Sequence, residues 1–201
     1  MMTSVPIMEH FYTLQGEGFW AGTPAYFIRF AGCDVGCVWC DVKESWEVAE
    51  DQYMEIAALV AEVKASGARH VVITGGEPTT YDLGPITQAL KDAGLKTHIE
   101  TAGVYPLTGH FDWVTLSPKK FKPALKENFD LAHELKVIVY NRHDLKWAQE
   151  QAAKCDPART MLLLQPEWSK RADLQHEIIE FIKANPDWKL SVQTHKYVNI
   201  P

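Results

Sequence analysis

Short apolar runs recur along the chain and predict buried strands. Each run is shorter than a helix needs, and such runs are typical of parallel strands that are covered on both faces. The predicted strands occupy residues 26–30, 71–73, 97–99, 113–116, 135–140, 161–164 and 190–192.

Helical periodicity lies between several of these runs. Apolar residues three or four positions apart share one face within 53–63 (including Tyr53), 83–90 and 174–182, and the composition of 144–154 also favours a helix. Gly67, Gly94 and the Asn185-Pro186 pair mark helix ends. Strands that alternate with helices over short connections predict a parallel α/β fold.

The length of the chain limits the form of this fold. About seven strands in 201 residues are too few for a complete eight-unit barrel, which needs roughly 250 residues. We therefore predict an α/β fold with an incomplete TIM-like barrel of parallel strands. No internal repeat, low-complexity tract or linker interrupts the pattern, so residues 1–201 are expected to form a single domain.

Glycine-bearing and polar segments follow most of the predicted strands. In parallel α/β sheets, ligands bind at the carboxyl ends of the strands. Six such segments therefore predict a site on one rim, at residues 31–33, 74–78, 100–103, 117–119, 165–166 and 193–196.

Composition narrows the classes of partner. The formal net charge of −6 argues against nucleic-acid binding along a phosphate backbone and against attraction to an anionic membrane. No apolar run approaches the ~18 residues of a membrane span, and residues 1–11 lack the pattern of a secretory signal. We expect a cytoplasmic protein, in which structural disulfides are disfavoured.

Three of the four cysteines lie within eight residues, in the spacing Cys33-x3-Cys37-x2-Cys40. Three thiolates can hold three irons of a [4Fe–4S] cluster and leave the fourth iron open to a ligand. Two alternatives remain at this point: a zinc site completed by His10 or Asp41, and a redox pair of Cys37 and Cys40. Cys155 is expected to be a packing residue.

The cysteine spacing, with Trp39 before the last cysteine, resembles the signature of the radical S-adenosylmethionine (SAM) superfamily. The segment Thr74-Gly75-Gly76-Glu77-Pro78 is similar to that superfamily's second motif, whose backbone meets the amino group of SAM. The resemblance implies that SAM chelates the open iron. One electron then cleaves SAM into methionine and a 5′-deoxyadenosyl radical.

Motifs at both ends of the chain narrow the resemblance. The segment 11–18 (FYTLQGEG) and the segment 193–201 (QTHKYVNIP) are similar to the 7-carboxy-7-deazaguanine synthases, radical SAM lyases of queuosine and deazapurine biosynthesis. The resemblance implies that the substrate is 6-carboxy-5,6,7,8-tetrahydropterin. The radical would abstract hydrogen at C6, the ring would contract, ammonia would leave, and the product would be 7-carboxy-7-deazaguanine.

The same resemblance assigns site residues. The cluster ligands are Cys33, Cys37 and Cys40, and no side chain is assigned as an acid or base. Substrate contacts are expected from Leu14, Gln15, Gly16, Arg29, Thr74, His195 and Pro201, with Arg29 as a bidentate partner of the substrate carboxylate. SAM contacts are expected from Trp39, Cys40, Asp41, Gly76, Ser117, Pro118, Lys119, Gln165, Pro166, Glu167 and Trp168.

One position departs from the family pattern. The family usually has Thr after the Cys-Asp pair, where it helps to hold Mg²⁺, but this chain has Val42. An isopropyl group cannot ligate a hard cation that prefers oxygen. Magnesium binding is therefore doubtful, and any Mg²⁺ would rely on substrate, water and backbone oxygens.

Partners and rival functions complete the expectations. The basic residues Lys119, Lys120, Lys122 and Lys126 suggest a docking patch for an acidic flavodoxin or ferredoxin that donates electrons. The family implies a homodimer. The alternative enzyme is a glycyl-radical-enzyme activase, which would not need the 193–201 ending, and the non-enzymatic alternative is a zinc-stabilised binding module.

Overall fold

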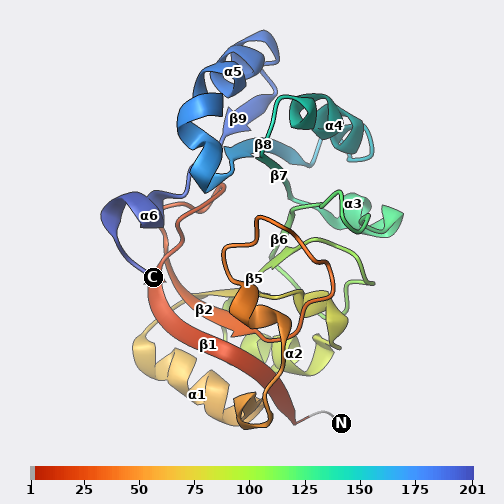
Figure 1. Cartoon of the computed structure of the whole chain (residues 1–201). Helices are drawn as coiled ribbons and strands as arrows, with labels where there is room; N and C mark the ends of the chain where they lie inside the picture. The colour runs from red at the N-terminus through yellow and green to blue at the C-terminus, as the bar shows by residue number, and fades with distance from the viewer. Residues whose placement is uncertain (1–2) are drawn as a thin grey trace.

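The computed structural model describes residues 3–201, in which one long sheet is covered by helices (Figure 1). Its strands are β1 (Ser4–Leu14), β2 (Pro24–Phe30), β3 (Tyr53–Glu55), β4 (His70–Gly75), β5 (Lys96–Thr101), β6 (Trp113–Leu116), β7 (Glu134–Val139), β8 (Met161–Pro166) and β9 (Trp188–Leu190). Its α-helices are α1 (Ile56–Ser66), α2 (Gly84–Asp92), α3 (Lys126–Leu131), α4 (His143–Ala152), α5 (Arg171–Ala184) and α6 (Thr194–Val198).

The sheet order is β3-β1-β2-β4-β5-β6-β7-β8-β9, and the sheet does not close. Every pair from β2 through β9 is parallel, whereas β1 runs antiparallel to both β2 and β3. Six of the seven parallel strands coincide closely with predicted runs, whereas β9 lies two residues earlier than expected and shares only Leu190 with its run. The predicted α/β fold with an incomplete parallel barrel is confirmed.

Three features differ from the sequence-based expectation. Strand β1 was not predicted, because its buried and exposed positions follow no simple period, and pairing with strands on both sides stabilises it instead. Tyr53 does not share the helix face of α1; it lies on β3 and is 54% exposed. Helices α3 and α6 have six and five residues, too few for periodicity to reveal.

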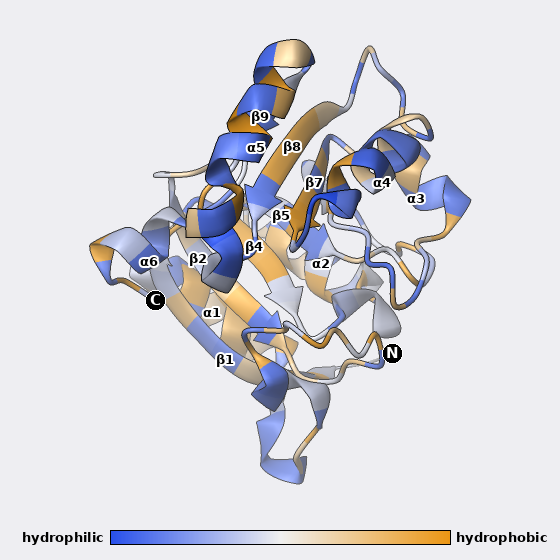
Figure 2. Cartoon of the chain, turned by 45° about the horizontal axis from the view of Figure 1, so that its top comes forward, coloured by the Kyte–Doolittle hydropathy of each residue, from blue (hydrophilic) through white to orange (hydrophobic). Residues whose placement is uncertain are grey.

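The core lies between the sheet and its helices. One apolar cluster packs α1 and α2 against the first strands, and a second packs α4 and α5 against β7 and β8; these two strands are mostly orange in Figure 2. Along β7, Leu135, Val137 and Val139 face this second cluster, and Lys136 and Ile138 alternate with them toward the opposite, inner face. Helices therefore leave one face of the sheet free for a site. Among residues 3–201, no helix combines the length and apolarity that crossing a membrane requires.

Gly75 ends β4 in a conformation that disfavours other residues. Its φ is +146°, and a Cβ there would lie 2.3 Å from the carbonyl oxygen of Phe30. We expect Gly75→Ala to lower the free energy of unfolding by about 3–5 kcal/mol, because it adds a backbone clash to conformational strain. Urea denaturation measures this loss.

Gly94→Ala is the matched control. Gly94 also has positive φ (+76°), but no atom lies within 4 Å of the position that a Cβ would take there. We expect only the strain of about 1–2 kcal/mol. If the two variants lost the same free energy of unfolding, the clash with Phe30 would contribute nothing to the effect of Gly75→Ala.

Candidate active site

A cavity of about 520 Å³ opens on the inner face of the sheet, at the carboxyl ends of the parallel strands. Its size suits small organic ligands. It is lined by the predicted residues Leu14, Gln15, Gly16, Arg29, Cys33, Cys37, Trp39, Cys40, Asp41, Thr74, Gly76, Ser117, Lys119, Gln165, Pro166, Glu167, Trp168, His195 and Pro201. Pro118 lines a smaller neighbouring cavity instead. The structure thus brings the candidates together, and their individual roles stay predictions.

The cysteine loop (residues 31–42) forms one wall of this cavity. Backbone bonds fix its start, with Gly32 N donating to Ser45 O at 2.7 Å and Cys33 N to Trp46 O at 3.2 Å. Cys40 N closes a turn on Cys37 O at 3.1 Å. The three thiols are free of disulfides and pack against a small apolar cluster of Val35, Ala102 and Val104.

The chemistry of this loop fits an iron–sulfur cluster. Burial raises the pKa of Cys33, and it raises the pKa of Cys37 to about 11, so iron must displace protons when it binds. Within residues 3–201, no three His, Cys, Asp or Glu side chains surround one common metal position. A cubane sets a different requirement, because each thiolate binds its own iron. Three free thiols along one cavity wall meet that requirement.

The segment after β4 packs tightly against the cysteine loop. A Cβ on Gly76 would lie 2.3 Å from Gly32 O and 2.7 Å from Ser45 O. The lack of a side chain at Gly76 therefore lets the backbone of Gly32 and Ser45 pack closely against it. It would also allow a close approach of SAM. The buried Glu77 carboxylate accepts bonds from Thr79 and from Ala102 N at 2.7 Å, which joins the ends of β4 and β5.

The wall predicted to meet SAM carries a half-buried cation. Lys119 Nζ donates to the carbonyl and hydroxyl oxygens of Ser117 at 2.7 and 2.6 Å, and it lies 5.6 Å from the ring of Trp39. Burial lowers the pKa of Lys119. Farther along the wall, the guanidinium of Arg171 covers the ring of Trp168 at 3.9 Å.

The motifs from the two ends of the chain meet in space. Thr194 donates to Gly16 O from both its amide and its hydroxyl, each at 2.8 Å. A Cβ on Gly16 would lie 2.1 Å from His195 Nδ1, so glycine is what lets the imidazole lie on this loop. Burial lowers the pKa of His195.

The residues near Val42 do not fit a magnesium site. Val42 lines the cavity without an oxygen ligand. The neighbouring Asp41 carboxylate accepts from Lys196 Nζ at 2.9 Å and from Gln193 Nε2 at 3.5 Å. The carboxylate next to Val42 in the chain is therefore already paired with a lysine ammonium.

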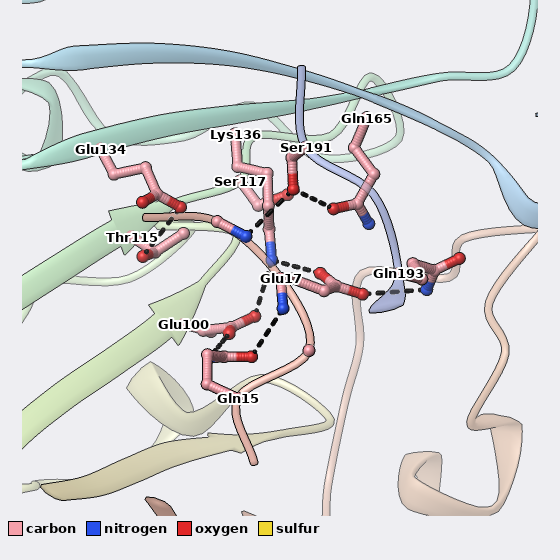
Figure 3. Close-up of polar contacts among 12 residues, drawn as sticks. Gln15, Glu17, Glu100, Thr115, Ser117, Glu134, Lys136, Gln165, Ser191 and Gln193 are labelled. Atoms are coloured by element: carbon pink, nitrogen blue, oxygen red, sulfur yellow. Dashed lines mark hydrogen bonds and ion pairs between the residues drawn. The ribbon is translucent and has the colours of Figure 1, made fainter. Parts of the chain in front are cut away.

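Sequence reasoning missed a buried ion network at the floor of the cavity (Figure 3). Lys136 on β7 has a side chain only 3% exposed, and its Nζ lies 2.5 Å from Glu17 Oε2 and 2.9 Å from Glu100 Oε2. Gln15 Nε2 donates to the other oxygen of Glu100 at 2.8 Å, and Gln193 Nε2 to that of Glu17 at 2.9 Å. The one available signal in the sequence is a lysine within the apolar run at 135–140.

The network stays charged despite its burial. Burial alone would raise the pKa values of Glu17 and Glu100. The attraction of the Lys136 ammonium is larger, so the net effect is that both pKa values are lowered. For Lys136 itself, the opposing effect of burial is overcome by the carboxylates, and its pKa is raised. Two anions against one cation leave the cavity floor with an excess of negative charge.

Comparison with known proteins agrees with this site. Residues 27–141 match the model of the radical SAM superfamily. The chain is 52% identical to the 7-carboxy-7-deazaguanine synthase of Flavobacterium psychrophilum, over 98% of this chain and 93% of that protein. It is 46% identical to the enzyme of the same name from Synechocystis, over 100% and 95%. The crystal structure of QueE from Escherichia coli superposes with a TM-score of 0.87 at 38% identity, covering 96% of this chain and 95% of that one.

Lys136→Met tests the network. We expect the variant to lose about 2–4 kcal/mol of unfolding free energy at pH 7.5, because two largely buried carboxylates, 15% and 19% exposed, lose their cation. Urea denaturation measures the loss. Lys183→Met is the control, because it breaks an exposed ion pair with Glu180 and should change stability little.

The pH dependence of this loss follows from the pKa shifts. In the wild type, the stability from Glu17 and Glu100 is present above the unfolded glutamate pKa of about 4.3 and is lost as pH falls through their lowered values. Without Lys136, burial is the largest remaining influence, opposed only in part by the amides of Gln193 and Gln15 and by Arg29, so both pKa values rise. Protonation then stabilises the folded variant, so its deficit should shrink between pH 7.5 and pH 5. A deficit independent of pH would contradict the charge assignment.

Proposed function

The chain belongs to the radical SAM superfamily and, within it, to the 7-carboxy-7-deazaguanine synthases, and on this basis we propose that it converts 6-carboxy-5,6,7,8-tetrahydropterin into 7-carboxy-7-deazaguanine with loss of ammonia. It is an enzyme of the lyase class, which removes the zinc-stabilised binding module from consideration. The full-length match favours the synthase over a glycyl-radical-enzyme activase. One observation supports the proposal above all: the cysteine loop and both terminal motifs line the same cavity.

Cys33, Cys37 and Cys40 would hold the [4Fe–4S] cluster on one wall of the cavity. When bound, the cluster and SAM supply a 5′-deoxyadenosyl radical, which is chemistry that no side chain provides. The protein's contribution is to hold the reactants and to exclude water. The neighbouring wall, with Lys119, Trp39 and Trp168, supplies a cation and aromatic surface suited to the carboxylate and the rings of SAM.

The opposite wall suits the pterin. Arg29 offers a planar cationic fork to the substrate carboxylate. The Gln15 amide already donates to Glu100 and accepts from Glu17 N, and its second N–H is offered to the hydrogen-bonding edge of the ring. The floor carries excess negative charge that would face the N–H donors of the ring. His195 and Pro201 line the same cavity. These groups would fix the position of the substrate relative to SAM.

The remaining expectations belong to the same proposal. We place the enzyme in the cytoplasm as a homodimer, as its family membership suggests, and the four free cysteines are in keeping with a reducing compartment. The single continuous sheet supports one domain over residues 1–201. Because Val42 and Asp41 do not fit a magnesium site, we propose that the reaction does not depend on a protein-bound Mg²⁺.

Anaerobic reconstitution followed by turnover tests the function. Protein supplied with SAM, a reductant and the carboxytetrahydropterin should release 7-carboxy-7-deazaguanine, identified by its mass. Cys33→Ser should lose the cluster's broad visible absorbance and all activity, whereas Cys155→Ser should retain both, because Cys155 packs in the distant second core cluster. Activity in Cys33→Ser, or no product from the wild type, would refute the proposal.

We also propose that an acidic flavodoxin or ferredoxin docks beside the cysteine loop. The basic segment borders this loop: Phe121 packs on Trp39, and Lys122 Nζ binds Asp34 at 2.7 Å. Lys120 is likewise paired, with Asp144 at 2.5 Å, and Lys119 points into the cavity. In the part of the chain that the structure describes, Lys126 alone of the four basic residues has neither an ion pair nor a place in the cavity wall.

Lys126→Glu should therefore slow reduction of the cluster by such a donor several-fold at low salt, and added salt should remove the difference, because exposed charges are screened. Stopped-flow bleaching of the cluster measures the rate. Lys64→Glu on α1 is the control. Equal rates for the wild type and Lys126→Glu at low salt would end the docking proposal.

A further inference from the structure

Arg29 is held from one side by a carboxylate that lies outside the predicted set of site residues. Its Nε donates to Glu9 Oε1 at 2.6 Å, and the side chains of Arg29 and Glu9 are 18% and 43% exposed. Both residues line the cavity. Phe11 and Phe27, on the same two strands, also line the cavity, and their rings stack at 5.5 Å.

A bulge in the β1–β2 ladder places Glu9 opposite Arg29. Near the start of β1, Ile7 pairs with Phe30, and this register would set Met8 against Arg29. The register then shifts by one residue, so that Glu9 faces Arg29 and His10 faces Ile28. Bulges re-aim side chains next to functional sites. Without the shift, an apolar thioether would stand where the carboxylate is.

The position of Glu9 determines which donors of Arg29 remain. A guanidinium can bind a carboxylate through its Nε side or through its two terminal nitrogens. Glu9 occupies the Nε side, and among residues 3–201 no acceptor takes the terminal N–H groups. The end-on fork therefore stays available to a ligand in the cavity.

A second carboxylate, that of Glu100 at the cavity floor, lies within the electrostatic reach of Arg29. Because Glu100 already accepts from Lys136 and Gln15, a bond to Arg29 would draw the fork down toward the floor. Glu9 instead holds Arg29 from the neighbouring strand, β1.

We propose that Glu9 is a positioning residue, which holds Arg29 by Nε so that its terminal nitrogens meet the substrate carboxylate end-on instead of turning to Glu100. The inference rests on the proposed function, since it needs a carboxylated pterin as the ligand. An ordinary cross-strand ion pair would affect stability alone. A positioning role changes the recognition of the carboxylate specifically.

The test compares binding of 6-carboxypterin and pterin, which differ only in the carboxylate, to the reconstituted enzyme with SAM. Fluorescence titration gives both dissociation constants. We expect the wild type to prefer 6-carboxypterin by more than about tenfold through the charge-assisted fork. Glu9→Ala should lose most of this preference by weakening 6-carboxypterin alone, and KM for the substrate should rise by a similar factor with kcat less affected.

Two further variants separate positioning from charge and stability. Glu9→Gln keeps an oxygen that accepts from Nε, so it should retain a clear part of the preference. Glu180→Gln, on the exposed face of α5, should behave as the wild type. Melting temperatures of all variants establish that the folded enzyme is compared.

The outcomes are distinguishable. A wild type that binds the two pterins equally would overturn the proposed substrate, and this inference with it. A wild-type preference that persists in Glu9→Ala would overturn the role of Glu9 and leave the proposed function intact. An equal loss of affinity for both ligands in Glu9→Ala would also overturn it, because it would reveal a general structural effect.

Discussion

The ammonium of Lys136 lies on the inner face of the sheet, between the carboxylates of Glu17 and Glu100, and this contact joins three distant parts of the chain. Glu17 belongs to the loop between β1 and β2, Glu100 to β5, and Lys136 to β7. Buried ion pairs contribute little net stability on average, but removing one partner is costly. The network therefore favours one arrangement of these segments over others and fixes the shape of the cavity floor.

Because the sheet does not close, contacts outside the strand ladder must hold its first strands near its last strands. Hydrogen bonds along the ladder hold each strand to its neighbours, but nothing in the ladder joins β1 and β2 to the far strands. The β1–β2 loop makes that connection, since Gly16 O accepts from Thr194 and Gly18 N donates to Ser191 Oγ at 3.0 Å. Figure 1 shows this loop rising toward α6 and the base of α5. The loop thereby places the N-terminal motif (residues 11–18) in contact with the C-terminal motif (residues 193–201).

Charge is distributed unevenly around the resulting cavity. Lys119 stands on the wall next to the cysteine loop, Arg29 stands on the β1–β2 wall, and the two carboxylates occupy the floor with Lys136. Partial exclusion of water strengthens each of these interactions. A radical enzyme needs this kind of site, because its protein must hold two reactants in one orientation while the cofactors supply the reactivity.

The sequence by itself determined the seven parallel strands, the three-thiol loop and most of the cavity lining. These features depend on local patterns: short apolar runs, the spacing of three cysteines, and polar segments directly after strands. Parallel packing brings all strand ends to one edge, so residues that follow strands must share a rim. For the same reason, the incomplete barrel could be predicted from the number of strands and the chain length.

Only the tertiary structure decided the partners of Lys136 and of Arg29. Lys136 and Glu17 are 119 positions apart, and a charged residue in an apolar strand does not reveal which distant carboxylate will meet it. Arg29 meets Glu9 because one bulge shifts the register of an antiparallel pair, and β1 itself shows no simple period. Such contacts depend on strand order and register, which arise from packing of the whole sheet and leave no mark in any short stretch of sequence.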